Sequence, residues 1–355
     1  MREEDWERLE ELARIEEGDD FDSLFWQGSH PYTARDTVAQ AEFEARLATV
    51  LDPSGLRGAF AAANALGDQA ALSRLSEVGR SAGWSESVRA TASMWSGYAV
   101  LAGGRWEMAD GGRCPTIRAP EGMGGVMCAL IPFLPVPDDA LRALRAAVAA
   151  WDSVPAADGE RADSIASADP DAALRPHGRL YVLGAIDARL GDAQAALGAA
   201  DRLETLPTPS RWRPTVRALA RTLRAEVALR AGRAEEALAL LAVPADAPPP
   251  ELANHPVFAR ELERLWRADA LYEAGRNEEA LRWYRNAFAY TFDEEIYRPY
   301  ITLRRAELLD RLGRPEEAAA EYSRFLELWP DPAPDLHPLV EDARQRLATL
   351  RSERT

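Results

Sequence analysis

The chain has 355 residues, more than one compact core usually holds, so we expect several domains or a stack of repeats. All 42 basic residues are Arg, and the absence of Lys excludes P-loop, pyridoxal-phosphate and protein-kinase sites, each of which depends on a Lys. The net charge of −16, with no basic cluster among aromatic residues, argues against nucleic-acid binding.

Residues 1–52 are predicted to form acidic helices, at 3–17 and 33–50. The first 22 residues hold eleven acidic side chains against three Arg, unlike the basic start of a signal peptide. No stretch approaches the ~20 apolar residues of a transmembrane helix. We therefore expect no membrane span and a cytoplasmic location, unless the chain is one region of a longer protein whose other parts carry targeting signals.

Residues 53–151 predict degenerate helical hairpins. One turn between helices is expected within 63–75, and Gly104 belongs to a second hairpin of similar spacing. Residues 127–151 contain two apolar stretches that Pro135 and Pro137 divide, which fits a further helix pair.

A glycine-rich run at 103–125 carries Arg105, Arg113 and Arg118 and could hold an anion with its backbone N–H groups. It lacks the strand, turn and helix order of known phosphate loops, so we interpret it as a loop between repeats. Residues 152–175 are small, acidic and broken by prolines, which indicates a flexible loop.

Residues 176–330 contain four copies of one pattern, and this repetition is the strongest signal in the sequence. Each copy has a Gly that is expected to end a first helix in the left-handed conformation, followed by acidic residues that suit the start of a second helix. Small residues five positions after and seven positions before each Gly mark where the two helices touch. The four glycines are Gly191, Gly232, Gly275 and Gly313; the small residues are Ala196, Ala237, Ala280 and Ala318 after them, and Gly184, Ala225, Ala268 and Ala306 before them.

This pattern resembles the tetratricopeptide repeat, a helix-turn-helix unit of 34 residues with small residues at fixed positions. Tyr284 and Tyr322 match its aromatic position and Pro330 its terminal one. The spacings of 41, 43 and 38 residues are longer than the family's. The resemblance implies an all-α, right-handed superhelical solenoid, and residues 331–355 are predicted to supply its capping helix, at 339–350.

The sequence predicts no catalytic, cofactor or metal site. Each of the four His residues adjoins a Pro, no HExxH or CxxC motif occurs, and Cys114 and Cys128 do not form a disulfide framework. The paired acidic residues that open the second helices, such as Glu235 and Glu236, are interpreted as solvated partners of the helix dipole. The aromatic residues of 292–300 could line a groove.

In the family that this chain resembles, first helices line a concave face that often binds a peptide. The ninth positions here include acidic residues, which disfavour the known clamp on a C-terminal carboxylate and suit a peptide that carries both charges or is rich in Arg. Alternatively, these residues form a solvated surface. The matching positions are Ala185, Ala188 and Arg189; Glu226, Leu229 and Arg230; Asp269, Tyr272 and Glu273; and Glu307, Asp310 and Arg311.

These observations predict a non-enzymatic scaffold that binds a protein or peptide partner. The alternative is the regulatory or sensor region of a larger bacterial signalling protein, such as a protein kinase or transcription activator, whose C-terminal repeat regions the chain resembles in style. An enzyme that closes over a small ligand at 103–125 is the third possibility. The sequence does not determine the oligomeric state.

Overall fold

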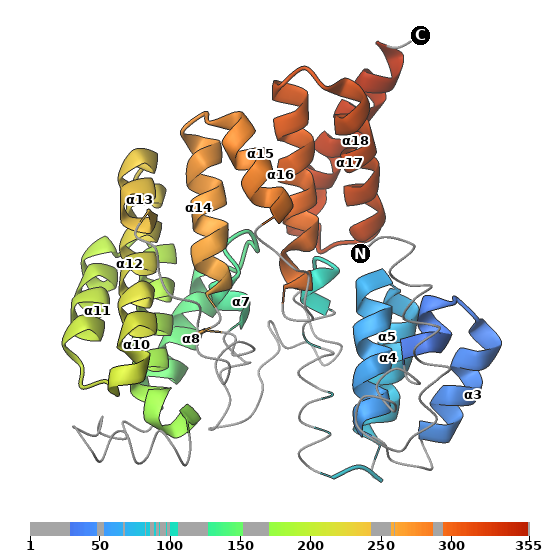
Figure 1. Cartoon of the computed structure of the whole chain (residues 1–355), viewed down its shortest axis with the longest axis horizontal. Helices are drawn as coiled ribbons and strands as arrows, with labels where there is room; N and C mark the ends of the chain where they lie inside the picture. The colour runs from blue at the N-terminus through green and yellow to red at the C-terminus, as the bar shows by residue number, and fades with distance from the viewer. Residues whose placement is uncertain are drawn as a thin grey trace. The chain divides into compact units, whose positions relative to one another are not determined.

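The computed structural model describes residues 29–47, 53–66, 68–81, 83–85, 89, 92, 97, 100–105, 127–151, 170–242, 257–258, 260–286 and 294–353. Every regular element in these ranges is a helix, which confirms the all-α class (Figure 1). The chain divides into two compact units. Met1–Arg105 and Tyr290–Arg298 form the first unit, and Trp106–Ala289 and Pro299–Thr355 form the second.

The first unit contains α3 (Thr37–Leu47), α4 (Pro53–Leu66) and α5 (Gln69–Arg80). Asp68 begins α5 as its N-cap and accepts a hydrogen bond of 2.9 Å from the backbone N–H of Ala71, so the turn predicted within 63–75 is confirmed. Phe43, Phe60 and Leu72 lie in one buried apolar cluster. The helix predicted at 3–17 lies outside the described residues.

The second unit begins with α7 (Met127–Leu130) and α8 (Asp138–Ala149). Non-helical residues 131–137 separate them, so the predicted division by Pro135 and Pro137 is confirmed. Arg179 donates hydrogen bonds of 3.1 and 2.6 Å to the carbonyl oxygens of Val148 and Ala149, which stabilises the C-terminal end of α8.

Helical hairpins follow in the predicted region. The first pair is α10 (Pro170–Arg189) with α11 (Ala193–Thr205), and the others repeat this order. The start of α10 at Pro170 corrects the predicted loop at 152–175, because a proline in the first turn lacks only an N–H that would be unpaired there. The remaining helices are α12 (Arg213–Arg230), α13 (Ala234–Leu241), α14 (Glu261–Glu273), α15 (Asn277–Asn286), α16 (Arg298–Arg311), α17 (Pro315–Leu328) and α18 (His337–Ser352), with short 3-10 turns η2 (Ser210–Trp212), η4 (Glu295–Tyr297) and η5 (Pro334–Leu336).

The glycines between paired helices have the predicted left-handed backbone. Their φ angles are +81° at Gly191, +72° at Gly232, +71° at Gly275 and +68° at Gly313. Gly104, in the degenerate region, has a φ of +69°. Residues with a Cβ rarely adopt this conformation, so the repeated Gly has a geometric cause.

The small residues of the pattern lie at close helix contacts, as predicted. A Cβ atom built on Gly184 would lie 2.8 Å from Leu223 Cδ1 and 3.0 Å from Ala199 Cβ. The seven alanines at the matching positions of the hairpins are fully buried. A larger side chain at these contacts would overpack them, at about 1–3 kcal/mol.

The acidic pairs lie in the first turns of the second helices, and a recurring Arg precedes each pair. Three ion pairs of the same i,i+3 spacing result, with N···O distances of 2.9, 2.7 and 2.6 Å. Such surface pairs contribute little to stability. They join Arg233 to Glu236, Arg276 to Glu279 and Arg314 to Glu317.

The C-terminal helix packs against the last hairpin. α18 contacts α17 and buries Val340, Leu347 and Leu350, so the predicted helix at 339–350 is confirmed and extends to His337–Ser352. Among the described residues, no helix is long and apolar enough to cross a membrane.

Candidate functional site

The first helices of three hairpins, α12, α14 and α16, line a pocket of about 380 Å³ within the second unit. We call this the inner pocket. Residues of the turn after α7 and one residue of α18 complete it. Its lining residues are Pro132, Phe133, Leu229, Arg230, Trp266, Asp269, Glu273, Tyr300, Leu303, Arg304, Glu307 and Leu339.

The inner pocket contains five of the predicted groove residues: Leu229, Arg230, Asp269, Glu273 and Glu307. Asp269 and Glu307 occupy the ninth position of the repeat, Leu229 the twelfth, and Arg230 and Glu273 the thirteenth, so all three positions contribute to the lining. Trp266 and Arg304 occupy equivalent positions, two residues before the small residue of their hairpins, which the groove prediction did not include. Phe133 lies outside the four repeats, so the repeat pattern could not identify it. Tyr300 comes from the aromatic segment 292–300, which was predicted as a possible groove wall.

A buried carboxylate lies at the bottom of the inner pocket. Asp269 is 7% exposed and accepts hydrogen bonds from the hydroxyl groups of Tyr284 and Tyr300, the latter at 3.1 Å. Burial raises the pKa of Asp269 to about 6, and the positive charge of Arg304 and the two tyrosines oppose that rise. Asp269 is therefore held by the protein's own tyrosines.

A second set of contacts joins α14 to α16. Arg304 donates hydrogen bonds to the Tyr300 hydroxyl oxygen at 2.9 Å and to Glu307 at 2.8 Å. Its guanidinium carbon lies 4.4 Å from the ring centroid of Tyr272, and that of Arg311 lies 4.0 Å from the same centroid. Burial, with Glu307 adding to it, raises the pKa of Tyr272 to about 12. These predicted groove residues thus neutralise one another.

Two further predicted residues also have partners within the chain. Glu226 is 2% exposed and forms an ion pair of 2.9 Å with Arg230, which lies on the rim of the inner pocket. Asp310 forms two contacts of 2.5 and 2.6 Å with Arg346 of α18. The two-pronged geometry anchors α18 to α16.

Arg189 contacts backbone rather than open space. Its guanidinium donates hydrogen bonds of 2.9, 2.9 and 2.6 Å to the carbonyl oxygens of Ala129, Ile131 and Leu134. Burial, with the charge of Arg230 adding to it, lowers the pKa of Arg189 to about 10. Arg189 was predicted as a groove residue, but its hydrogen-bonding capacity is directed to the chain's own α7 region.

The inner pocket retains binding capacity that these contacts do not use. Trp266 is 6% exposed, and its indole N–H has no hydrogen-bond acceptor within the described part of the chain. Buried donors without acceptors are rare in folded proteins, and this one belongs to a side chain that lines the pocket. Leu339, 38% exposed, and Glu273 lie at the surface of the same pocket. The pocket therefore combines apolar walls, a buried donor and an exposed carboxylate.

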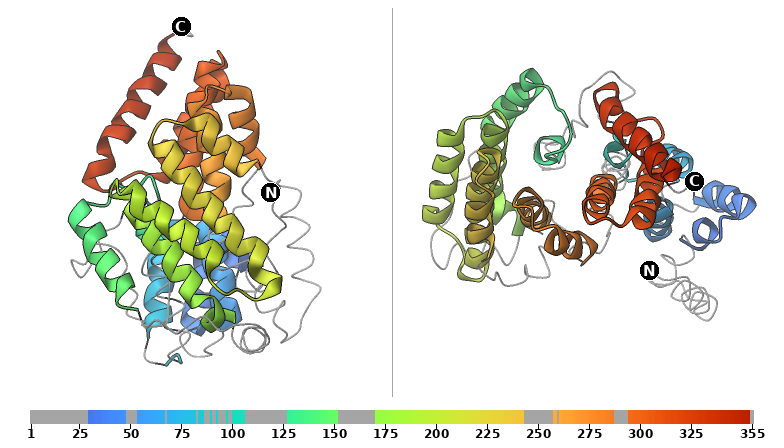
Figure 2. Two further views of the ribbon diagram at one scale, coloured as in Figure 1. Left: turned by 90° about the vertical axis from the view of Figure 1, so that its left-hand side faces the viewer. Right: turned by 90° about the horizontal axis from the view of Figure 1, so that it is seen from above.

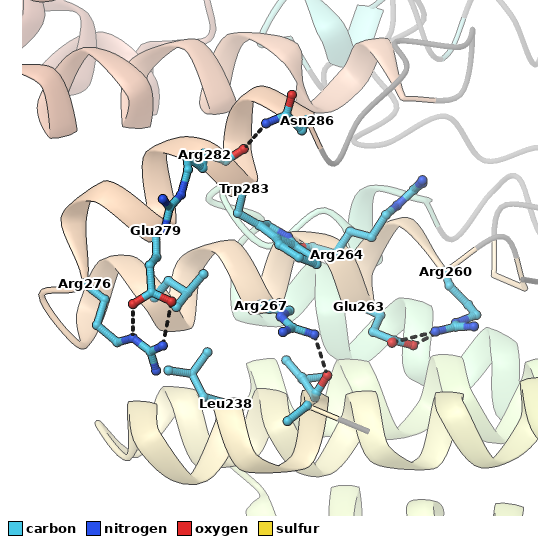
Figure 3. A pocket seen from close by; sticks show the side chains of 13 residues that line it. Leu238, Arg260, Glu263, Arg264, Arg267, Arg276, Glu279, Arg282, Trp283 and Asn286 are labelled. Atoms are coloured by element: carbon cyan, nitrogen blue, oxygen red, sulfur yellow. Dashed lines mark hydrogen bonds and ion pairs between the residues drawn. The ribbon is translucent and has the colours of Figure 1, made fainter. Parts of the chain in front are cut away.

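Figure 3 shows a second pocket, of about 870 Å³, lined by α13, α14 and α15. It holds five Arg residues, but most are matched by carboxylates. Arg260 pairs with Glu263 at 2.6 Å and Arg276 with Glu279 at 2.7 Å. Arg267 packs 4.4 Å from the ring centroid of Trp283 and donates to the carbonyl oxygen of Leu241. The two Glu residues of the lining and the internal contacts of Arg267 engage several of these Arg side chains, so fewer of them are available to an anion than the arginine content suggests.

Groups suited to catalysis are engaged structurally where the structure describes them. His177 is fully buried, its Nε2 lies 2.8 Å from Thr208 Oγ1, and burial lowers its pKa to about 4. His337 Nε2 lies 3.1 Å from the carbonyl oxygen of Pro332. Over the described ranges, no three His, Cys, Asp or Glu residues cluster in a way that could hold a metal ion. Arg113, Arg118 and Cys114 lie outside those ranges.

Comparison with known proteins adds no assignment to this geometry. No protein-family model matches the sequence, and no curated protein matches it either.

Proposed function

We propose that the chain is a non-enzymatic protein-interaction module and that the inner pocket binds a peptide or protein partner. The observation that carries this proposal is the buried indole N–H of Trp266 beside apolar walls and the exposed Glu273. A peptide main chain supplies carbonyl acceptors at regular intervals, and its side chains supply apolar and basic groups. Both match the pocket better than a carboxylate-terminated ligand, because Glu273, the exposed carboxylate of the pocket, would repel it.

The repeat geometry supports the same function. Successive first helices pack on one another, α10 on α12 and α12 on α14, and the second helices α11 and α13 contact the first helix of the next hairpin. We infer that the four hairpins form a right-handed solenoid of the tetratricopeptide type, in which the inner pocket lies on the concave face. The left-handed glycines and buried small residues support this assignment.

Affinity capture with matched variants tests the proposal. Leu339→Glu combined with Glu273→Arg puts a charge in place of an apolar side chain and reverses the exposed charge of the inner pocket. Leu197→Glu makes the same change at an equally exposed leucine of α11. We expect partners captured by the wild-type chain to be lost with the double variant and kept with Leu197→Glu. If every partner survives the double variant, the inner pocket is not the binding site.

The second candidate is a regulatory or sensor region of a larger bacterial signalling protein. In this candidate the inner pocket also binds the partner, but the chain is joined to a catalytic or DNA-binding domain. Sequencing of the native open reading frame distinguishes the two, because a kinase or DNA-binding domain in the same frame would favour this candidate.

A further inference from the structure

The chain places part of itself against the face that we propose for a partner. Residues 129–136, the end of α7 and the turn after it, contact Arg189 of α10 and reach the inner pocket; we call them the inner segment. The view from above in Figure 2 shows α7 enclosed by the helices of the second unit. Arg189 of α10 holds three main-chain carbonyl oxygens of the inner segment.

Side chains of the inner segment are held to different degrees. Ile131 and Leu134 are buried at 0% and 1% exposure. Pro132 and Phe133, between them, are only half-buried and form one wall of the inner pocket. The segment is therefore anchored by buried residues on both sides of the half-buried Pro132 and Phe133.

The Phe133 ring lies against an aromatic surface. It stacks on Tyr300 with a centroid distance of 4.7 Å and an angle of 6° between the ring planes. The ring of Trp329 lies 6.3 Å from Phe133, at an angle of 43°. Stacked aromatic pairs stabilise a contact beyond the effect of the apolar area that they bury.

The arrangement has the features of a bound peptide. Side chain to main-chain hydrogen bonds hold the backbone, the Phe133 ring stacks on Tyr300, and Pro132 and Pro135 restrict the chain on either side. Rotation of the half-buried Phe133 side chain would uncover the Tyr300 ring without disturbing Arg189 or the buried Ile131. The space left by the Phe133 ring would then open directly into the inner pocket.

We propose that the Phe133 side chain occupies a binding site for an aromatic ring, the Tyr300 subsite, which is the face of the Tyr300 ring that Phe133 covers. The partner is an extended peptide that has an aromatic residue beside a proline, and this aromatic residue takes the place of Phe133. This inference rests on the proposed function, because it names the chemistry of the peptide that the inner pocket binds. The main chain of the partner would accept from the Trp266 indole N–H, and its aromatic ring would stack on Tyr300.

The chain's own sequence supplies the probe. A fluorescein-labelled synthetic peptide, ALIPFLPVP, copies residues 129–137, and a second peptide has Ala in place of the Phe. Fluorescence anisotropy measures binding to the full chain and to Phe133→Ala, in which the subsite is empty. We expect the Phe peptide to bind Phe133→Ala about tenfold more tightly than the wild-type chain, and more tightly than the Ala peptide by a similar factor; tenfold corresponds to about 1.4 kcal/mol.

A matched pair at Tyr300 identifies the subsite. In the Phe133→Ala background, Tyr300→Phe keeps the aromatic ring and removes only the hydroxyl group, whereas Tyr300→Leu removes the ring. Binding of the Phe peptide should persist in the first and disappear in the second. Circular dichroism checks that each variant is folded, and the comparison of the two peptides on Phe133→Ala needs no change at Tyr300.

Equal binding of the Phe and Ala peptides, or equal binding to wild type and Phe133→Ala, would overturn the proposal. That result is distinguishable from failure of the proposed function. Loss of captured partners with the Leu339 and Glu273 changes would still locate a partner at the inner pocket, while the copied peptide would show that its chemistry is different.

Discussion

Tyr272 of α14 donates a hydrogen bond of 2.7 Å to Glu307 of α16, so the twelfth position of one hairpin is joined to the ninth position of the next. The Tyr272 hydroxyl also accepts a hydrogen bond from Arg311. Tyr272, Glu307 and Arg311, which the sequence predicted to contact a partner, therefore contact one another. The contribution of this cluster to stability can be measured separately from binding.

Removal of the Tyr272 hydroxyl should destabilise the second unit. Tyr272→Phe leaves Glu307 and Arg311 without that partner, and a lost hydrogen bond to charged groups costs about 1.5–3 kcal/mol. Urea denaturation followed by circular dichroism measures the change. Tyr322→Phe is the control, because no hydrogen bond of the Tyr322 hydroxyl occurs among the described residues; its unfolding free energy should stay within about 0.5 kcal/mol of wild type. Equal losses in both variants would contradict the role of the cluster.

Two glycines with equally open surroundings should respond to Ala in opposite directions. A Cβ on either Gly232 or Gly198 would meet nothing within 4 Å, but only Gly232 has a left-handed φ, of +72°. Gly232→Ala should destabilise by about 1–2 kcal/mol through backbone strain. Gly198→Ala, inside α11, should stabilise by about 0.5–1 kcal/mol because Ala favours a helix.

Thermal denaturation of both variants checks this prediction. If Gly232→Ala were as stable as the wild-type chain, the left-handed backbone at this position would not require a glycine.

His177 should make folding sensitive to mild acid. Its pKa falls from 6.5 to about 4 on folding, so the unfolded chain binds the proton more readily and stability is lost as the pH drops from 6.5 towards 4. The loss at pH 5 is about 2 kcal/mol for this group. His177→Gln keeps a polar group near Thr208 Oγ1 but does not titrate.

Denaturation at pH 7.5 and pH 5 tests the His177 prediction. The wild-type chain should lose about 2 kcal/mol more than His177→Gln between these two values. The difference between the proteins matters, because Asp269, whose pKa is raised to about 6, shifts stability in the opposite direction in both of them. An identical loss would mean that His177 is protonated in the folded state.

Arg189 should contribute far more to the free energy of unfolding than an exposed arginine does. Arg189→Met leaves three carbonyl oxygens of the inner segment without a donor, which we expect to cost about 2–4 kcal/mol. Arg142→Met removes only an exposed ion pair with Asp138 and should change stability by less than about 0.5 kcal/mol. Chemical denaturation of the two variants gives the comparison; a neutral Arg189→Met would show that Arg189 does not hold the inner segment.

Local features of the fold were predictable from the sequence alone. Gly191 and Gly313 end their helices as expected, because a left-handed residue after a helix is a matter of backbone sterics within a few residues. The same holds for Ala237 and Ala280, whose neighbours lie on the paired helix at a constant spacing. The early start of α10 was missed because prolines on both sides made residues 152–175 resemble one uninterrupted loop.

The candidate site was only partly predictable. Repeat spacing placed Leu229, Arg230 and Glu273 on the inner pocket, since equivalent positions of stacked hairpins face the same side. The same spacing could not show that Tyr272 contacts Glu307, which lies 35 residues away. Pairing between side chains of adjacent hairpins depends on the distance and angle between helices, which no single repeat encodes.

The sequence by itself determined an all-helical chain of hairpins, because glycine conformation, small-residue contacts and helix starts act within one repeat. The tertiary structure decided which of the variable residues remain accessible. Arg189 is used on carbonyl oxygens 55 to 60 residues earlier in the chain, Phe133 covers Tyr300, and Trp266 keeps a buried N–H without an acceptor among the described residues. These relationships join segments of unrelated sequence, so they exist only once the hairpins have packed and brought the inner segment against them.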